Sequence, residues 1–125
     1  MAEVSMKKKA LAVLIGCVLL VAGWLALPAS ALQIFQAGAR VWQPTELSAA
    51  KNERVAWRNN SPNTHTVTSY GKAWPRKKRK NVVLETGEAT RARFDKARTY
   101  KFRCRLHSTL VDGVCDGMCG KVIVG

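Results

Sequence analysis

Residues 104–120 read Cys104-Arg-Leu-His107-Ser-Thr-Leu-Val-Asp-Gly-Val-Cys115-Asp-Gly-Met118-Cys119-Gly120. This stretch contains most of the side chains in the protein that bind soft metal ions, and the only other histidine is His65. Two imidazoles, one thiolate and a weak axial thioether form the donor set that favours copper in single-electron transfer. The stretch therefore predicts one copper ion, cycling between Cu(I) and Cu(II), held by His65, Cys104, His107 and Met118.

Each of these residues also has an ordinary structural interpretation. A single histidine is usually a surface residue or a hydrogen-bonded core residue, and a single cysteine can be a small buried hydrophobic residue. A methionine such as Met118 can simply fill the core. The joint arrangement favours the metal site, because every histidine and the only methionine after residue 6 stand where a copper site would use them.

The front of the chain has the pattern of a secretory leader. A basic start, Met6-Lys-Lys-Lys9, precedes an apolar run from Ala10 to Leu27, then Pro28 and the cleavage signature Ala29-Ser-Ala31. This predicts a signal peptide over residues 1–31 and one domain over residues 32–125. An uncleaved anchor is the alternative, since about 18 apolar residues can just span a bilayer. A third interpretation is a lipoprotein modified at Cys17. It is disfavoured because the apolar run continues well past that residue.

The leader implies an exported protein, periplasmic or extracellular, either released or membrane-anchored through residues 10–31. Cleavage would leave three cysteines, Cys104, Cys115 and Cys119. Outside the cytosol Cys115 and Cys119 could close a disulfide. Cys104 would then be the free thiol, and a metal would give it a reason to stay free.

The chain is strongly basic. Its net charge is +13, and loss of Lys7, Lys8, Lys9 and Glu3 with the leader would reduce it to +11. Five consecutive cations, Arg76 to Lys80, follow Trp74-Pro75. A solvated loop is one interpretation, and a docking surface for a redox partner with an acidic face is another. An anionic membrane surface is also possible, whereas nucleic acid, with Trp74 as a stacking residue, is the weaker alternative.

Alternating apolar and polar residues predict short strands rather than helices. The expected strands cover residues 32–36, 40–42, 54–59, 65–69, 82–84, 89–94, 100–104 and 121–124. Residues 59–63 are typical of a turn, and the segment from Glu46 to Glu53 fits either a helical turn or a loop. Many short strands at this spacing favour an all-β sandwich or barrel.

The sequence around these residues resembles the cupredoxins, the plastocyanin-like type-1 blue copper proteins. The resemblance rests on Tyr100-Lys-Phe-Arg-Cys104-Arg-Leu-His107, on Met118-Cys-Gly-Lys-Val-Ile-Val124, and on Arg54-Val-Ala-Trp-Arg-Asn-Asn60 followed by His65-Thr-Val. It implies an eight-stranded Greek-key β-sandwich with copper near one end. It also implies that His65, Cys104 and His107 are equatorial ligands, that Met118 is axial, and that Asn59 or Asn60 supports them.

The chain departs from this pattern in one place. Ten residues separate His107 from Met118, where small members of the family have two to four. A Cys115–Cys119 disulfide would restrain the longer loop and hold Met118 toward the ion. Leu110 stands where a shorter loop would place its methionine, so a site without an axial ligand, or with a cysteine there, is the alternative. Zinc held by Cys104, His107, Cys115 and Cys119 is a further alternative.

The function that follows is transfer of single electrons between redox partners by a monomeric copper protein that is not an enzyme. Both histidines are used by the metal site, and the sequence contains no Gly-rich phosphate loop. Copper trafficking, storage or resistance on the same fold is the alternative function. A surface-binding module with a structural metal is the third.

Overall fold

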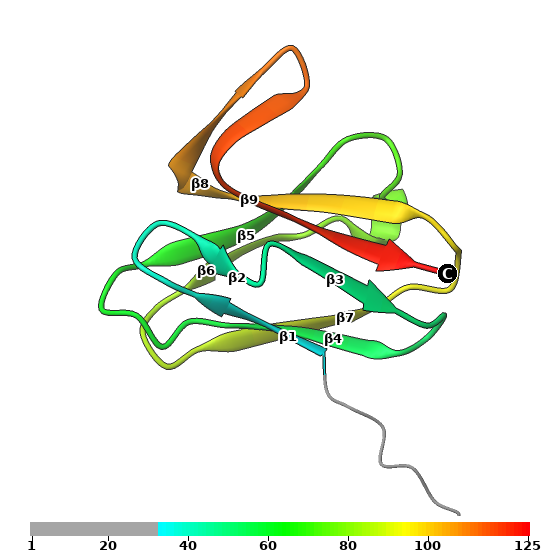
Figure 1. The fold of residues 1–125 in the computed structure, drawn as a ribbon, viewed down its shortest axis with the longest axis horizontal. Helices are drawn as coiled ribbons and strands as arrows, with labels where there is room; N and C mark the ends of the chain where they lie inside the picture. Colours follow the sequence, from blue (N-terminus) through cyan, green and yellow to red (C-terminus); the bar gives the residue numbers. More distant parts are fainter. Residues whose placement is uncertain (1–32) are drawn as a thin grey trace, which may run out of the picture. The chain divides into compact units, whose positions relative to one another are not determined.

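Two β-sheets pack against each other in the computed structural model, which describes residues 33–125 (Figure 1). One sheet has the order β2-β1-β4-β7 and the other β3-β9-β8-β5-β6. The first sheet contains β1 (Gln33–Ala37), β2 (Trp42–Gln43), β4 (Arg54–Arg58) and β7 (Ala89–Arg93). The second contains β3 (Glu46–Ala49), β5 (His65–Tyr70), β6 (Asn81–Leu84), β8 (Thr99–Val111) and β9 (Val114–Val124).

The predicted all-β sandwich is therefore confirmed, with nine strands among the described residues where eight were expected. All these strands and their pairings lie within the compact unit Leu32–Gly125. The predicted leader, residues 1–31, lies outside the described range. No helix within residues 33–125 has the length and apolar character needed to cross a membrane.

Aromatic side chains fill the space between the sheets. Phe102 is fully buried, and its ring makes edge contacts with Phe35, Trp42 and Trp57 at centroid distances of 4.7, 5.6 and 5.3 Å. Such edge-to-face pairs add stabilisation beyond that of burial alone. The ring of Phe102 thus holds the two sheets together near the middle of the sandwich.

The segment from Glu46 to Glu53 is neither a helical turn nor a simple loop. Its first half is β3, an edge strand parallel to β9, and its second half is a turn in which Asn52 has a φ of 64°. Glu, Leu and Ala favour helices by propensity, but pairing of Leu47 with Val122 and burial of Ala49 decide the outcome.

β8 and β9 extend beyond the other strands as a two-stranded hairpin, which we call the arm (residues 108–117; Figure 1). At its tip Asp112 and Gly113 have positive φ angles of 50° and 77°. These angles match the tight turn that joins twisted antiparallel strands without splaying them. The long loop expected between His107 and Met118 is therefore an ordered hairpin.

The strands run between two ends of the sandwich. The histidine end comprises the start of β5 at His65, the end of β4 at Arg58, residues 104–107 of β8, loops 38–41, 59–64 and 85–88, and the arm. The basic end comprises loops 50–53, 71–80 and 94–98, with the short 3-10 helix η1 (Arg76–Lys78). The start of β1 and the end of β9 also lie at the basic end, because Gln33 pairs with Val55 and Thr99 pairs with Ile123.

Trp74 lies beneath the basic loop rather than on its surface. Only 2% of it is exposed, its ring packs on Phe94 and Tyr100, and its Nε1 donates a hydrogen bond to the Lys101 carbonyl at 2.7 Å. Stacking of nucleic-acid bases needs an accessible ring face. The suggestion that Trp74 stacks on nucleic-acid bases is therefore wrong.

Candidate metal centre

Three donor atoms meet at the histidine end. The Nδ1 atoms of His65 and His107 lie 3.2 Å apart, and the Sγ atom of Cys104 lies 3.7 and 3.4 Å from them. An ion about 2.0 Å from each nitrogen and about 2.3 Å from the sulfur, in a trigonal plane, needs donors about 3.5–3.7 Å apart. The observed triangle has nearly these sides. His65 and Cys104 are buried, whereas His107 is partly exposed.

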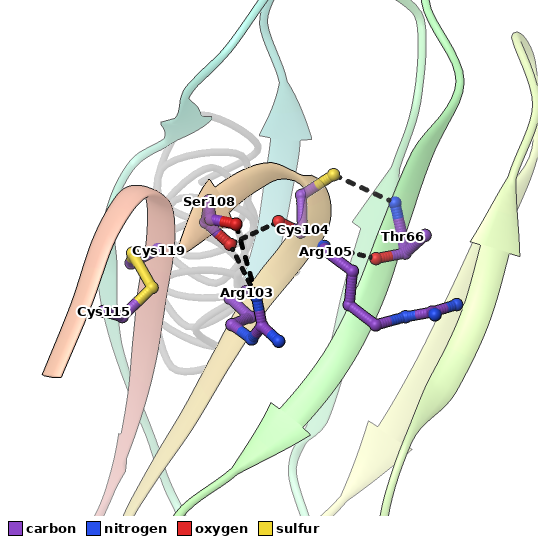
Figure 2. Close-up of a disulfide and its surroundings, with 7 residues drawn as sticks. All are labelled: Thr66, Arg103, Cys104, Arg105, Ser108, Cys115 and Cys119. Carbon is purple, nitrogen blue, oxygen red and sulfur yellow. Dashed lines mark hydrogen bonds between the residues drawn. A yellow bond between two sulfur atoms is a disulfide. The ribbon is translucent and has the colours of Figure 1, made fainter. Parts of the chain in front are cut away.

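A register break in the sheet brings Cys104 and His107 to the same point. Pairing of β8 with β9 stops at Arg103–Cys119 and resumes at Ser108–Gly117. Residues 104–107 of β8 therefore lie opposite the single residue Met118 of β9. The extra residues bend β8, and the hydroxyl of Ser108 donates a hydrogen bond to the Cys104 carbonyl across this bend (Figure 2). The bend turns His107 back toward Cys104.

Hydrogen bonds fix the orientation of the His65 ring. Its Nε2 lies 2.9 Å from the Ser61 hydroxyl, which lies 2.7 Å from the Asn59 side-chain oxygen. The Asn59 amide nitrogen in turn donates to the carbonyls of Asn63 and Leu84. The single proton of the hydroxyl goes to Asn59, so Ser61 accepts from Nε2–H of His65. This tautomer leaves the Nδ1 lone pair free for a metal.

The surroundings also keep His65 neutral. Burial lowers its pKa below the usual value, and the positive charge of a protonated His107 would lower the pKa further. Only a neutral imidazole binds a metal, so protons compete weakly at this position. Asn59 thus supports His65, whereas Asn60 is exposed. Ser61 was not foreseen, although its place two residues after Asn59 is typical of a side-chain turn.

The Cys104 sulfur accepts a hydrogen bond from the backbone N–H of Thr66 at 3.3 Å (Figure 2). Thr66 follows His65, so β5 supplies both a ring donor and an amide aimed at the sulfur. The Thr66 hydroxyl also accepts a bond from the Arg105 N–H, which ties β5 to the bend in β8. An N–H directed at sulfur tunes the potential of a metal bound to that sulfur.

Met118 is fully buried in the same core as Cys104 and lies opposite the bend in β8. β9 is sharply kinked there, since Gly117 has a φ of 105° and the Cα atoms of Cys115 and Cys119 are 6.2 Å apart. Four residues of straight strand would span about 13 Å. Leu110, the alternative neighbour of the ion, lies on the arm and is 39% exposed.

The three cysteines of residues 33–125 divide as the sequence suggested. Cys115 and Cys119 form a disulfide, and Cys104 is free and buried. The disulfide removes two of the four ligands that the zinc alternative requires, so that alternative is wrong. One cysteine sulfur with two imidazoles and a buried thioether nearby is instead a donor set that fits copper.

Replacement of Ser61 by alanine should weaken copper binding by roughly 10-fold or more, because His65 loses the acceptor that orients its ring. Competition with a copper chelator measures this affinity. Ser61→Thr is the matched control, since it keeps the hydroxyl and should stay close to the unaltered protein. Equal affinity in the alanine and threonine variants would show that the hydroxyl does not position the ring.

Comparison with known proteins agrees with this geometry. Residues 30–125 match the family of copper binding proteins of the plastocyanin/azurin type. No curated protein sequence matches the chain significantly. Among solved structures, a reduced proline-to-phenylalanine mutant of amicyanin is 22% identical with a TM-score of 0.63, over 80% of this chain and 88% of that one.

A second similar structure is a purple cupredoxin from Nitrosopumilus maritimus. It is 20% identical with a TM-score of 0.56, over 74% of this chain and 99% of that one. At these identities the two structures support the fold, whereas the sequence match covers the whole sandwich and the residues of the donor triangle. The chain therefore belongs to the plastocyanin/azurin family of copper-binding proteins.

Proposed function

We propose that this protein carries single electrons through one copper ion held by His65, Cys104 and His107, with Met118 as a weak axial ligand. The observation that carries the proposal is the triangle of two Nδ1 atoms and one Sγ, with sides of 3.2–3.7 Å. One mixed imidazole and thiolate site suits both Cu(II) and Cu(I). Little rearrangement then accompanies the transfer of an electron.

The rigidity of the donors favours electron transfer over catalysis. His65 is tied to the Ser61–Asn59 network, and Cys104 accepts a bond from β5. Within residues 33–125 the donor triangle is the one cluster of His, Cys, Asp or Glu suited to a metal ion. The partly exposed His107 gives an electron a short route to the surface. We therefore propose that redox partners approach the histidine end and that the protein is a monomer without enzymatic activity.

Metal content and the optical spectrum of residues 32–125, purified without reductant, test this function. We expect one copper per chain and an intense visible band that disappears on reduction and returns on oxidation. A colourless copper complex would exclude the electron carrier and favour the trafficking or storage role. A coloured complex that cannot be cycled would have the same consequence.

Replacement of Met118 by leucine should keep copper and raise the reduction potential, because the lost thioether stabilises Cu(II) more than Cu(I). If that difference is about 1.4 kcal/mol, the potential rises by about 59 mV. Leucine has nearly the same volume, so packing changes little. Voltammetry of both proteins measures the shift, and Leu110→Ala on the exposed arm is the control. An unchanged potential would show that Met118 is not a ligand.

A further inference from the structure

The charges of this protein are segregated between its two ends. The basic end has eleven cations and two carboxylates, Glu53 and Asp95. The histidine end has four cations, Arg40, Arg58, Arg105 and Arg103, whose guanidinium contacts Ser108, against four carboxylates, Glu85, Glu88, Asp112 and Asp116. The eleven cations are Lys51, Arg54, Lys72, Arg76, Lys77, Lys78, Arg79, Lys80, Arg93, Lys96 and Arg98. The net charge of the molecule therefore arises mainly from one end.

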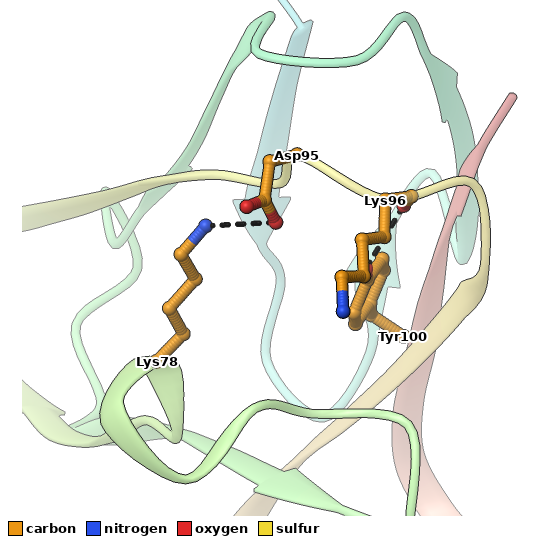
Figure 3. Close-up of polar contacts among 4 residues, drawn as sticks. All are labelled: Lys78, Asp95, Lys96 and Tyr100. Carbon is orange, nitrogen blue, oxygen red and sulfur yellow. Dashed lines mark hydrogen bonds and ion pairs between the residues drawn. The ribbon is translucent and has the colours of Figure 1, made fainter.

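Most of these cations form no ion pair with a carboxylate among residues 33–125. Of the eleven, Lys78 is the one that forms an ion pair with a carboxylate of the described residues, at 3.2 Å from Asp95 (Figure 3). A groove between the edge strands β6 and β7 is lined by six basic side chains: Lys77, Lys78, Arg79, Lys80, Arg91 and Arg93. Crowded like charges repel one another, and an anionic surface relieves that repulsion.

The basic end is badly placed for direct electron exchange. Along β8, Cys104 at the donor triangle lies five positions after Thr99 at the basic end. At about 3.3 Å per residue, this is a separation of about 16 Å. A partner seated at the basic end would therefore stand on the far side of the sandwich from His107, so this surface fits a partner that need not reach the metal.

The chain also enters the sandwich at the basic end. Gln33 pairs with Val55, and the neighbouring Arg54 pairs with Arg93. Five residues, 28–32, connect the end of the apolar segment from Ala10 to Leu27 with Gln33. If the leader is not cleaved, those five residues span at most about 18 Å. A membrane-bound leader would then bring this end of the sandwich, and not the histidine end, to the bilayer surface.

We propose that the basic end is a docking surface for an anionic lipid bilayer, which holds the histidine end pointing away from the membrane. Basic residues spread over three loops suit a continuous layer of phosphate groups, which attracts each nearby cation. The proposal needs only the fold and its charges, so it stands apart from the electron-transfer role. It also holds for a cleaved chain, which would bind by electrostatics alone.

Binding of residues 32–125 to vesicles tests the proposal without the apolar leader. We expect binding to vesicles of phosphatidylglycerol and phosphatidylcholine in equal parts, none to pure phosphatidylcholine, and weakening by salt. Each cation near the surface contributes about fivefold, so Arg76→Gln with Lys77→Gln should weaken binding by about 25-fold. The matched control, Arg40→Gln with Arg58→Gln at the histidine end, removes the same charge and should change binding little.

Equal effects of the two double variants would overturn the proposal, because binding would then depend on total charge alone. Binding to soluble polyglutamate as tightly as to anionic vesicles would assign the basic end to an acidic protein instead. Orientation has its own test in the metal-free protein. Diethyl pyrocarbonate should modify His107 equally fast in free and vesicle-bound protein, and protection of His107 by vesicles would contradict the proposed orientation.

Discussion

Cys104→Ser should abolish the visible absorption of the copper-loaded protein. The intense colour of such sites arises from charge transfer between a cysteine thiolate and Cu(II), so it needs the sulfur. A serine hydroxyl is a neutral, hard donor at neutral pH, and the Thr66 N–H would lose its thiolate acceptor. Copper affinity should therefore also fall. The spectrum of the variant titrated with Cu(II) measures both effects.

The double variant Cys115→Ser with Cys119→Ser is the control for this experiment. These two sulfurs are bonded to each other and neither belongs to the donor triangle, so their loss should leave the colour in place. The comparison separates a ligand from nearby sulfur that has a structural role. Colour that persists without Cys104, or that disappears with Cys115 and Cys119, would remove the proposed donor triangle.

The donors could be predicted from sequence because the chemistry needs rare residue types. Only two histidines are present in the whole chain, and both supply a ring nitrogen to the triangle. The free state of Cys104 followed from the three cysteines that the predicted cleavage would leave, once Cys115 and Cys119 were paired. The alternating strands could be predicted equally well, because burial of one face of a strand imposes a period of two on the sequence.

The features that were missed depend on contacts between distant segments. Residues Glu46–Ala49 become a strand because β9 offers an unpaired edge, which local propensity does not encode. Trp74 is buried by Phe94 and Tyr100, although its basic neighbours suggested exposure. The arm did have a local signal, since Val111-Asp-Gly-Val114 is a typical hairpin turn sequence. The distance of the basic loop from the metal site appears only when the strand order is known.

Gly120→Ala should destabilise the protein by about 3 kcal/mol or more, because the added methyl would overlap the Phe102 ring. A Cβ at this position would lie 2.4, 2.8 and 3.0 Å from three carbons of that ring. Phe102 pairs directly with Gly120 across β8 and β9, and it cannot move away because Phe35, Trp42 and Trp57 pack against it. Denaturant unfolding of metal-free residues 32–125 measures the loss.

Two further variants show whether the ring is the cause. Gly38→Ala is the control, since its methyl would lie 3.2 Å from the exposed Val41 side chain and 3.3 Å from the Val41 carbonyl oxygen. Shifts of a few tenths of an ångström relieve such contacts, so the cost should stay at about 0.5 kcal/mol. In a Phe102→Leu background, Gly120→Ala should cost about 1–3 kcal/mol less than in the unaltered protein, because residues in contact are not additive. Additive costs would mean that the ring does not require glycine at this position. The penalty would then reside in the backbone of β9, next to the kink that holds Met118 in the core.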